Sequence, residues 1–381
     1  MFFLSKKNIK LKLLINTSNI VIGGGLQVSL SIIETLKKHP DNEYNIFVSP
    51  QVNRQLNTDD YPANFKFFLI ENSPANLRKR RKTLKILFEL ERTILPDLVF
   101  TVFGPSYWNP KSLHITGFAN GWCYTPDSIA FKKLSYLQLR KSKLLIFFKN
   151  RFIKKADYII VETETAKQNI YKNLNYPLKN IFVVGNTFHP SFLETEVLEK
   201  RKESDVFKLL VLSGFYPNKN LKIINEVVVE LQNKFKLKFK FILTLNDNTF
   251  KTNFIDSKYI ENIGPQNIID CKELYQKIDA LFLPTLLETF SANYLEAMVM
   301  KVPILTSDLD FARELCGNAA LYFNPLSPKD IAEKILELQE NENLQEELIR
   351  NGELKLEQFE TPESRTSKYL LIFKEIIINK K

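Results

Sequence analysis

Two glutamates in the last third of the sequence are the residues best suited to chemistry. Glu288 and Glu296 enclose seven residues in the stretch PTLLETFSANYLEAMVMKVPILTS, residues 284–307. Carboxylates accept paired hydrogen bonds from vicinal hydroxyls. The backbone N–H groups of a helix start favour a diphosphate. If the two features share one site, its ligand carries both a diphosphate and a polyol, as a nucleotide sugar does.

The sequence around the two glutamates predicts the elements that position them. Residues 278–284 (IDALFLP) and 302–306 (VPILT) are short apolar runs typical of buried parallel strands. Between them, residues 291–300 have apolar side chains at helical spacing, enough for about three turns. This strand–helix–strand order places the loop 286–291 at the carboxyl edge of a sheet, where ligands of such sheets bind.

The glutamate spacing resembles that of the retaining glycosyltransferases of family 4. Their signature is a Glu, seven residues, a Glu in EAM and a strand with a proline, which stands here as ETFSANYLEAM followed by KVPILTSD. The resemblance implies an α/β protein of the GT-B fold, with two Rossmann-like domains facing each other across a cleft. It also implies a C-terminal helix that crosses back to the first domain. The family usually has glycines and a proline around the first Glu, where this chain has Thr289, Ser291 and Asn293.

The resemblance also assigns roles on the donor side. Glu288 is expected to contact the donor sugar and Glu296 the ribose hydroxyls, and either a nucleophilic or a positioning role is open to Glu288. Lys219, in SGFYPNKNL (213–221), is suited to neutralise a diphosphate as a point charge. Many relatives have an Arg before this Lys where this chain has Phe215, so Arg313 or an Arg of the first domain is a candidate replacement. Other expected donor-binding residues are Thr289, Phe290, Ser291, Gly214 and Gly264.

In the first half, the sugar-facing position differs from that of the relatives, which often place a His after a strand. Here the strand ends in GFANGW (117–122), so Asn120 is the expected catalytic-side hydrogen-bond donor to the sugar. His114 lies inside that strand, and no acid or nucleophile stands beside it or His189 in the sequence, so both are interpreted as structural.

A glycine run marks the first strand-to-helix turn. Gly23, Gly24 and Gly25 follow a predicted strand at 9–16 and precede a predicted helix at 26–39. Glycine lets backbone approach a ligand closely at a helix start, although a tight turn alone also explains the run. The family usually carries a Gly-Gly pair here, which implies that these glycines lie on the acceptor or phosphate side.

The chain length predicts two domains, because 381 residues exceed the usual size of one hydrophobic core. A polar run at 194–205 separates two α/β patterns. We therefore expect an acceptor-binding domain at 1–193, on which 362–381 pack, and a nucleotide-sugar donor-binding domain at 194–361. The strands expected in the first domain span residues 9–16, 44–50, 65–71, 97–103, 112–118, 156–163 and 180–186.

Charge is concentrated in the first half of the chain. Residues 1–195 hold 28 Lys+Arg and 14 Asp+Glu, a net charge of +14, and the remainder has −4. Basic residues gather at 78–82 (RKRRK) and at 131–155, interleaved with aromatic residues and leucines. Such a surface attracts nucleic acid, an anionic membrane or a lipid-linked diphosphate acceptor, and a solvated helix face with no partner is the bland alternative.

Other features limit the class of protein. No stretch has the roughly 20 apolar residues that cross a bilayer, and the N-terminus does not match a secretory signal. We therefore expect a cytoplasmic protein, peripheral on the inner face of the plasma membrane. The three cysteines show no metal-ligand or disulfide spacing. Asp308 and Asp310 form a DxD pair, but hard-metal sites need more ligands, so no metal or other cofactor is expected.

These observations favour a retaining hexosyltransferase that moves a sugar from a UDP- or GDP-linked donor. Its expected acceptor is a glycan or lipid-diphosphate-linked glycan of a surface polysaccharide, such as lipopolysaccharide O-antigen, capsule or exopolysaccharide. Two alternatives stay open: a GT-B sugar-nucleotide epimerase or phosphorylase, and a basic nucleic-acid-binding protein. A NAD dehydrogenase is disfavoured because no full GxGxxG follows a strand.

Overall fold

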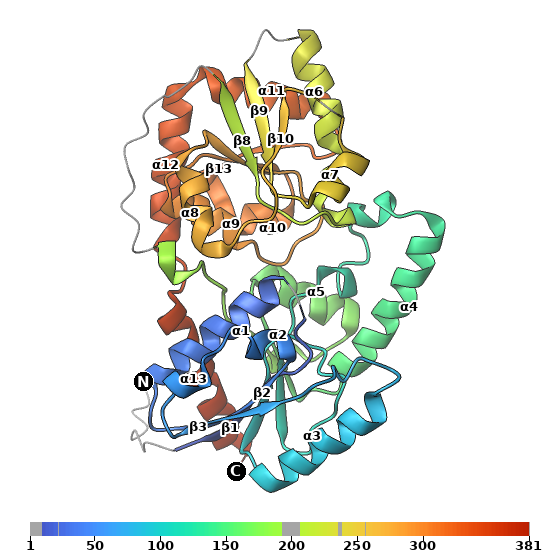
Figure 1. Cartoon of the computed structure of the whole chain (residues 1–381), viewed down its shortest axis with the longest axis vertical. Helices are drawn as coiled ribbons and strands as arrows, with labels where there is room; N and C mark the ends of the chain where they lie inside the picture. The colour runs from blue at the N-terminus through green and yellow to red at the C-terminus, as the bar shows by residue number, and fades with distance from the viewer. Residues whose placement is uncertain (1–9, 22, 193–205, 235–237, 256, 381) are drawn as a thin grey trace. The chain divides into compact units, whose positions relative to one another are not determined.

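The computed structural model describes residues 10–21, 23–192, 206–234, 238–255 and 257–380, and within them the chain forms two compact units (Figure 1). The first unit consists of Met1–Tyr124, Lys141–Asn186 and Glu360–Lys381, and the second of Thr125–Arg140 and Thr187–Phe359. The domain boundary expected between residues 193 and 194 lies outside the described residues.

The first unit contains a seven-stranded sheet in the order β3-β2-β1-β4-β5-β6-β7, and all of these strand pairings are parallel. Its strands are β1 (Lys12–Thr17), β2 (Glu43–Val48), β3 (Phe65–Leu69), β4 (Leu98–Thr101), β5 (Leu113–Gly117), β6 (Tyr158–Val161) and β7 (Ile181–Val183). Each lies within or beside one of the segments that the sequence predicts as strands. The apolar runs that identify them are nearly continuous because both faces of a parallel sheet are buried.

Helices cover both faces of this sheet. They are α1 (Gly24–Thr35), α2 (Pro50–Asn53), α3 (Arg80–Ile94), α4 (Tyr136–Ile153, of which Lys141–Ile153 belongs to this unit), α5 (Glu164–Leu174) and α13 (Pro362–Lys380). Alternate residues of β1 enter different cores: Leu13 and Ile15 join α1 and α13, and Leu14 joins α3. No helix in the described part of the chain combines the length and apolar composition of a bilayer-spanning segment.

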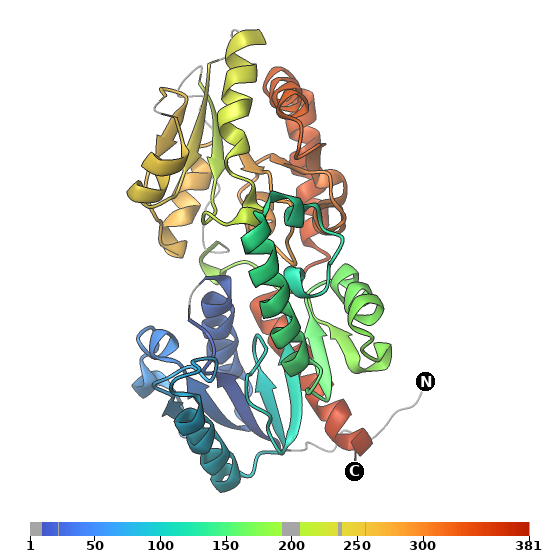
Figure 2. The same cartoon turned by 90° about the vertical axis from the view of Figure 1, so that its right-hand side faces the viewer.

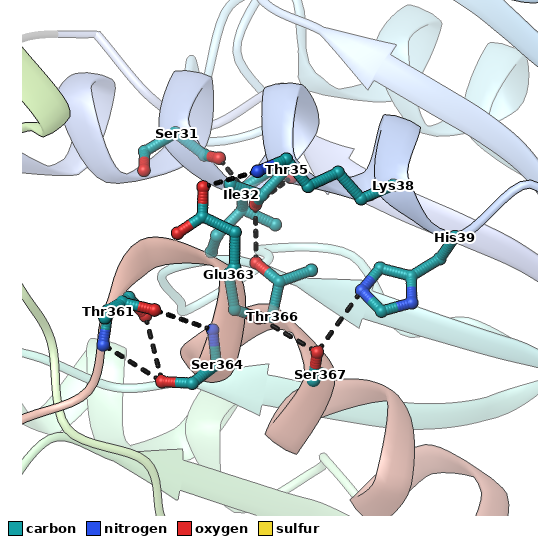
Figure 3. A network of polar contacts seen from close by, with 10 residues as sticks. All are labelled: Ser31, Ile32, Thr35, Lys38, His39, Thr361, Glu363, Ser364, Thr366 and Ser367. Atoms are coloured by element: carbon teal, nitrogen blue, oxygen red, sulfur yellow. Dashed lines mark hydrogen bonds and ion pairs between the residues drawn. The ribbon is translucent and has the colours of Figure 1, made fainter.

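The C-terminal helix α13 is an integral part of the first unit, as the GT-B resemblance implies. Its Tyr369 and Phe373 rings lie 5.2 and 5.0 Å from the Phe100 ring of β4, measured between centroids. Thr366 shares a 2.6 Å hydrogen bond with Thr35 of α1 in the polar network of Figure 3. The chain therefore leaves the second unit and completes the core of the first with its last helix.

The second unit contains a six-stranded sheet in the order β10-β9-β8-β11-β12-β13, again with parallel pairings throughout. Its strands are β8 (Phe207–Val211), β9 (Phe239–Leu243), β10 (Ile260–Asn262), β11 (Ala280–Leu283), β12 (Ile304–Ser307) and β13 (Ala320–Phe323). Its helices are α6 (Ile223–Lys234), α7 (Asp247–Asn253), α8 (Ile268–Gln276), α9 (Ala292–Val299), α10 (Asp310–Cys316), α11 (Pro328–Glu340) and α12 (Glu342–Leu356). The expected strand–helix–strand unit around the two glutamates is thus present as β11–α9–β12 (Figures 1 and 2).

In both sheets the second and third strands lie on one side of the first strand, and all later strands lie on its other side. The order of the strands thus reverses at the first strand. In the second unit β8 lies between β9 and β11, and in the first unit β1 lies between β2 and β4. In folds with such a point, ligands bind beside the loops at the carboxyl ends of the two central strands. The loops after β8 and β11 carry Lys219 and Glu288.

Candidate functional site

An ion pair between Lys219 and Glu288 occupies the reversal point of the second sheet. Lys219 closes the 3-10 turn Pro217–Lys219 after β8, and Glu288 lies in the loop between β11 and α9. The Nζ atom of Lys219 donates to Oε2 of Glu288, and each side chain keeps 20% of its exposure. The pair is therefore open to a ligand yet largely shielded from water, which strengthens its interactions with other charges.

An asparagine fixes the two loops that carry this pair. The Asn218 side-chain amide donates to the Leu287 carbonyl at 2.8 Å, and the Leu286 N–H donates to the Asn218 carbonyl at 2.7 Å. Asn220 adopts a left-handed conformation (φ 54°), which Asn tolerates better than most residues, and donates to the Pro325 carbonyl at 2.8 Å. Neither residue is predicted from the sequence. The segment PNKN, a turn-forming run in the loop after a buried strand, is the pattern that could indicate them.

Glu296 is buried on α9, the helix that directly follows the loop containing Glu288. It lies on α9 with 3% exposure, and the Tyr275 hydroxyl donates to its Oε2 at 3.1 Å. Burial raises the pKa of Glu296 to about 7, and the Tyr275 hydrogen bond opposes that rise. Asn293 ties the start of α9 to the end of β8 through a 2.6 Å bond to the Leu212 carbonyl. The carboxyl is therefore held in place and changes charge near neutral pH.

The remaining predicted donor residues of this unit differ in their surroundings. The Thr289 N–H donates to Oε1 of Glu288 at 3.2 Å, and Ser291 directly precedes α9. Phe290 is buried in the apolar core, where its ring meets Phe359 edge-on at 6.1 Å. Thr289 thus contacts the ion pair, whereas the Phe290 side chain packs in the core.

The two glycines predicted to bind the donor in this unit, Gly214 and Gly264, have different structural roles. A Cβ at Gly214 would lie 2.7 Å from Cε2 of Tyr216, so a side chain there would displace this exposed ring of the loop after β8. Gly264 has φ 78° and follows β10, the edge strand, which β9 separates from β8. Gly214 therefore shapes the Lys219 loop, and Gly264 shapes a turn two strands away from it.

A comparison with protein families matches residues 194–355 to the family "Glycosyl transferases group 1". That range contains Lys219, Glu288 and Glu296. Over this range, the sequence is similar to the group 1 glycosyltransferases.

The curated relatives of this chain are distant. The O-antigen chain mannosyltransferase RfbU of Salmonella typhimurium is 23% identical over 53% of this chain and 54% of its own length. An uncharacterized glycosyltransferase of Methanocaldococcus jannaschii is 23% identical over 87% of this chain and 89% of its own. The N,N'-diacetylbacillosaminyl-diphospho-undecaprenol alpha-1,3-N-acetylgalactosaminyltransferase of Campylobacter jejuni is 26% identical over 53% and 54%. The chain thus spans about half the length of two of these proteins.

Solved structures show the fold of the whole chain. A glycosyltransferase from Rickettsia africae has a TM-score of 0.71 at 16% identity, with 98% of this chain and 100% of that chain covered. WaaG, a glycosyltransferase involved in lipopolysaccharide biosynthesis, has a TM-score of 0.72 at 13% identity over 95% and 99%. Anabaena HepE in complex with UDP-glucose has a TM-score of 0.67 at 13% identity over 94% and 99%. The chain therefore has the GT-B fold.

The first unit holds the predicted Asn120 and the glycine run. Asn120 follows β5, and within the described part of the chain its buried side-chain oxygen accepts no hydrogen bond. Gly23 has φ 77°, a conformation that favours glycine, and Gly24 begins α1. A Cβ on Gly25 would lie 3.4 Å from the Phe103 ring, so the run also permits close packing. Their roles toward an acceptor stay predictions.

The described histidines and the DxD pair have structural partners. His114 shares a 3.0 Å hydrogen bond with Thr101, and burial lowers its pKa to about 4, so it is neutral at physiological pH. His189 bonds Ser191 at 2.8 Å. Asp308, which follows β12, pairs with Arg313 of α10 at 2.6 Å, so the proposed replacement arginine already has a carboxylate partner. Among the described residues no three His, Cys, Asp or Glu side chains gather as a metal site.

Proposed function

We propose that this glycosyltransferase transfers a sugar, with retention of configuration, from a UDP- or GDP-linked donor to a growing glycan. The observation that carries the proposal is the Lys219–Glu288 pair at the reversal point of the second sheet and inside the family-matched range. Glu296 is buried on α9, the helix that follows the Glu288 loop. A cation for a diphosphate and two carboxylates for hydroxyls are the groups that a nucleotide sugar requires.

In this proposal Lys219 stabilises the leaving diphosphate. When the bond between the sugar C1 and the phosphate oxygen breaks, negative charge grows on that oxygen, and a fixed ammonium in a shielded site lowers the barrier. The acceptor oxygen bonds to C1 on the same face as the leaving group. Its proton passes to the departing phosphate, so atoms and charge balance without a further reactant.

Glu288 has a positioning role in this scheme. Its contact with Lys219 cancels most of its repulsion toward a diphosphate, and a paired carboxylate is a weaker nucleophile than a free one. Its remaining acceptor capacity binds sugar hydroxyls, while Glu296 in its ionised form accepts from the ribose. The pairing thus favours attack guided by the leaving phosphate over a covalent glycosyl intermediate on Glu288.

The acceptor is proposed from the chemistry named for the relatives. One relative is named for an O-antigen chain and another for a diphospho-undecaprenol substrate. We therefore propose a glycan or lipid-diphosphate-linked glycan acceptor in surface polysaccharide synthesis, bound by the first unit on the side of Gly23–Gly25 and Asn120. The reaction would take place at the cytoplasmic face of a membrane.

A thermal-shift panel of UDP- and GDP-sugars tests the donor assignment. Specific donors raise the melting temperature of the wild type, because a ligand that binds only the folded state stabilises it. Glu296→Ala is expected to lose that shift while its melting temperature without ligand stays close to wild type. Turnover of the donor with no acceptor present, to an isomer rather than to a transfer product, would instead identify an epimerase.

A further inference from the structure

The first unit carries a surface that combines cations with exposed apolar side chains. Its two parts are residues 72–88, around the start of α3, and residues 141–155, which contain most of α4. Each part holds six Lys or Arg residues and no Asp or Glu. The two parts together are called the basic face below.

The structure brings these two sequence-distant parts into contact. The Arg80 guanidinium lies 4.9 Å from the centroid of the Phe152 ring of α4, and Lys155 Nζ lies 5.4 Å from the same ring. Arg80 also donates to the Pro74 carbonyl at 2.6 Å, which fixes its loop. The other edge of Phe152 meets Tyr107 at 5.5 Å. A cation–π contact thus joins the two basic runs into one surface.

Helix α4 turns one side inward and leaves the opposite side to solvent. Ile153 is buried, and Asn150 donates to the Cys123 carbonyl at 2.9 Å, so these residues mark the inner side. Lys141, Leu144 and Phe148 lie about half a turn away on the outer side, and in Figure 2 the helix lies in front of its sheet. The large apolar side chains exposed on the basic face are Leu77, Ile86, Phe88, Leu144, Leu145, Phe147 and Phe148.

We propose that the basic face is a docking surface for a bilayer that contains anionic lipids. The cations complement the lipid headgroups, and the leucine and phenylalanine side chains gain by entering the boundary with the acyl chains. Nucleic acid would bind the cations through its phosphates and stack its bases on aromatic rings. It would gain no binding energy from Leu144, which is 59% exposed. The inference rests on the proposed function only in the choice of a membrane as the acceptor's location, because the binding itself needs neither donor nor acceptor.

Vesicle co-sedimentation of the full chain tests the proposal. We expect binding to vesicles with about 30% phosphatidylglycerol in phosphatidylcholine and little binding to phosphatidylcholine alone, since each cation near an anionic surface is worth roughly fivefold in partitioning. Binding should weaken as salt rises.

Two double variants separate the electrostatic and apolar contributions. Lys141→Glu with Arg151→Glu should weaken vesicle binding by roughly a hundredfold or more. Leu144→Ser with Phe148→Ser should weaken it by roughly tenfold or more at unchanged net charge. Matched controls are Lys172→Glu with Lys251→Glu, which are exposed cations outside the basic face, and Leu354→Ser, an exposed leucine of α12. The controls for the charge pair carry the same change in net charge.

The outcomes divide cleanly. Loss of vesicle binding in both test variants, with wild-type melting temperatures and donor-induced shifts, supports the docking surface. Equal binding by wild type and the Leu144/Phe148 variant, or tighter binding to duplex DNA than to anionic vesicles, overturns it. Absence of vesicle binding with an intact donor shift overturns this inference alone, whereas vesicle binding without any donor shift overturns only the proposed function.

Discussion

The two units use the same sheet topology but differ in the chemistry at the point where the sheet reverses. In each, an asparagine of the first loop bonds carbonyls of the loop after the fourth strand: Asn19 reaches the Phe103 and Pro105 carbonyls, and Asn218 reaches the Leu287 carbonyl. The two corresponding segments of the first unit, residues 17–25 and 102–110, contain no charged residue. The second unit places Lys219 and Glu288 there.

Neutral polar groups continue beneath the reversal point of the first unit. Asn16 donates to Thr101 at 3.2 Å, and Thr101 bonds the neutral His114 at 3.0 Å. The two units thus share a scaffold, and the Lys219–Glu288 pair gives only the second unit a charged reversal point. A neutral counterpart suits a partner whose recognition depends on hydroxyl groups, as that of a glycan acceptor does.

The largest expected effect breaks the first unit while sparing the second. Phe373→Ala removes a buried ring of α13 that packs on Phe100, which should lower the free energy of unfolding by about 3–5 kcal/mol. Hydrogen exchange resolved by peptide should report the loss in the first unit, with donor-induced protection kept in the second. Leu371→Ala, on an exposed position of the same helix, is the control. Equal loss of protection in both units would show that they do not act as separate units.

The charged site itself is tested by Glu288→Gln, which keeps the shape of the side chain and removes its charge. We expect kcat/KM for transfer to fall about 10²- to 10³-fold, as for other groups that position and stabilise a reacting centre. Glu346→Gln, an exposed change in the same unit, should have no effect. Activity of the Glu288 variant within a few-fold of wild type would remove Glu288 from the mechanism.

Lys219→Met removes the cation of the second unit's reversal point and leaves Glu288 without its ion-pair partner. The variant should bind the sugar nucleotide about 10- to 100-fold more weakly, because a hydrogen bond to a charged group is lost. Affinity for the nucleoside without phosphates should stay unchanged in calorimetry. Lys222→Met, an exposed lysine three residues along, controls for net charge. A proportional loss of nucleoside affinity would contradict a diphosphate role.

A smaller effect is expected from Tyr275→Phe. The Tyr275 hydroxyl donates to Glu296 and lowers its pKa, so the variant should raise that pKa above about 7. Donor affinity at pH 7 should then fall a few-fold and recover near pH 9, where the carboxyl is again ionised. Titration calorimetry across pH measures this shift, with Tyr259→Phe as control. A loss that is the same at every pH would indicate a packing effect instead.

The sequence predicts the strands of the first sheet, β11 and β12 of the second sheet and the presence of the C-terminal helix, because parallel strands and amphipathic helices have local patterns. It misses β13, a four-residue edge strand whose two central residues are only half-buried. For the α4 region, the sequence predicts only a basic run and no defined helix. Several leucines and phenylalanines of α4 are exposed, so they do not show the apolar spacing of a core-facing helix. Such elements depend on their neighbours more than on their own residues.

The site shows the same limit. Lys219 and Glu288 are each expected as donor-side residues, but they are 69 positions apart, and their contact follows from the pairing of β8 with β11. Tyr275 lies in an ordinary helical pattern, and nothing in its sequence surroundings indicates a bond to Glu296. The family resemblance supplies residue types, whereas the strand order supplies their contacts.

In the proposed function, the ionised Glu296 carboxylate binds the donor. Since burial raises its folded-state pKa to about 7 from 4.5, the folded chain binds more protons than the unfolded chain between these values. Its contribution therefore makes stability fall as pH rises from 4.5 to 7, with no further change above. Donor binding has the opposite dependence, because only the ionised carboxyl accepts hydrogen bonds from both ribose hydroxyls.

Calorimetric titration of a sugar nucleotide at pH 6 and pH 8 tests that claim directly, since a diphosphate esterified at both ends does not titrate in this range. We predict that the wild type binds several-fold to about tenfold more tightly at pH 8. We also predict that Glu296→Gln binds weakly and equally at both pH values. Wild-type affinity that does not change with pH, together with unchanged affinity in Glu296→Gln, would contradict the account.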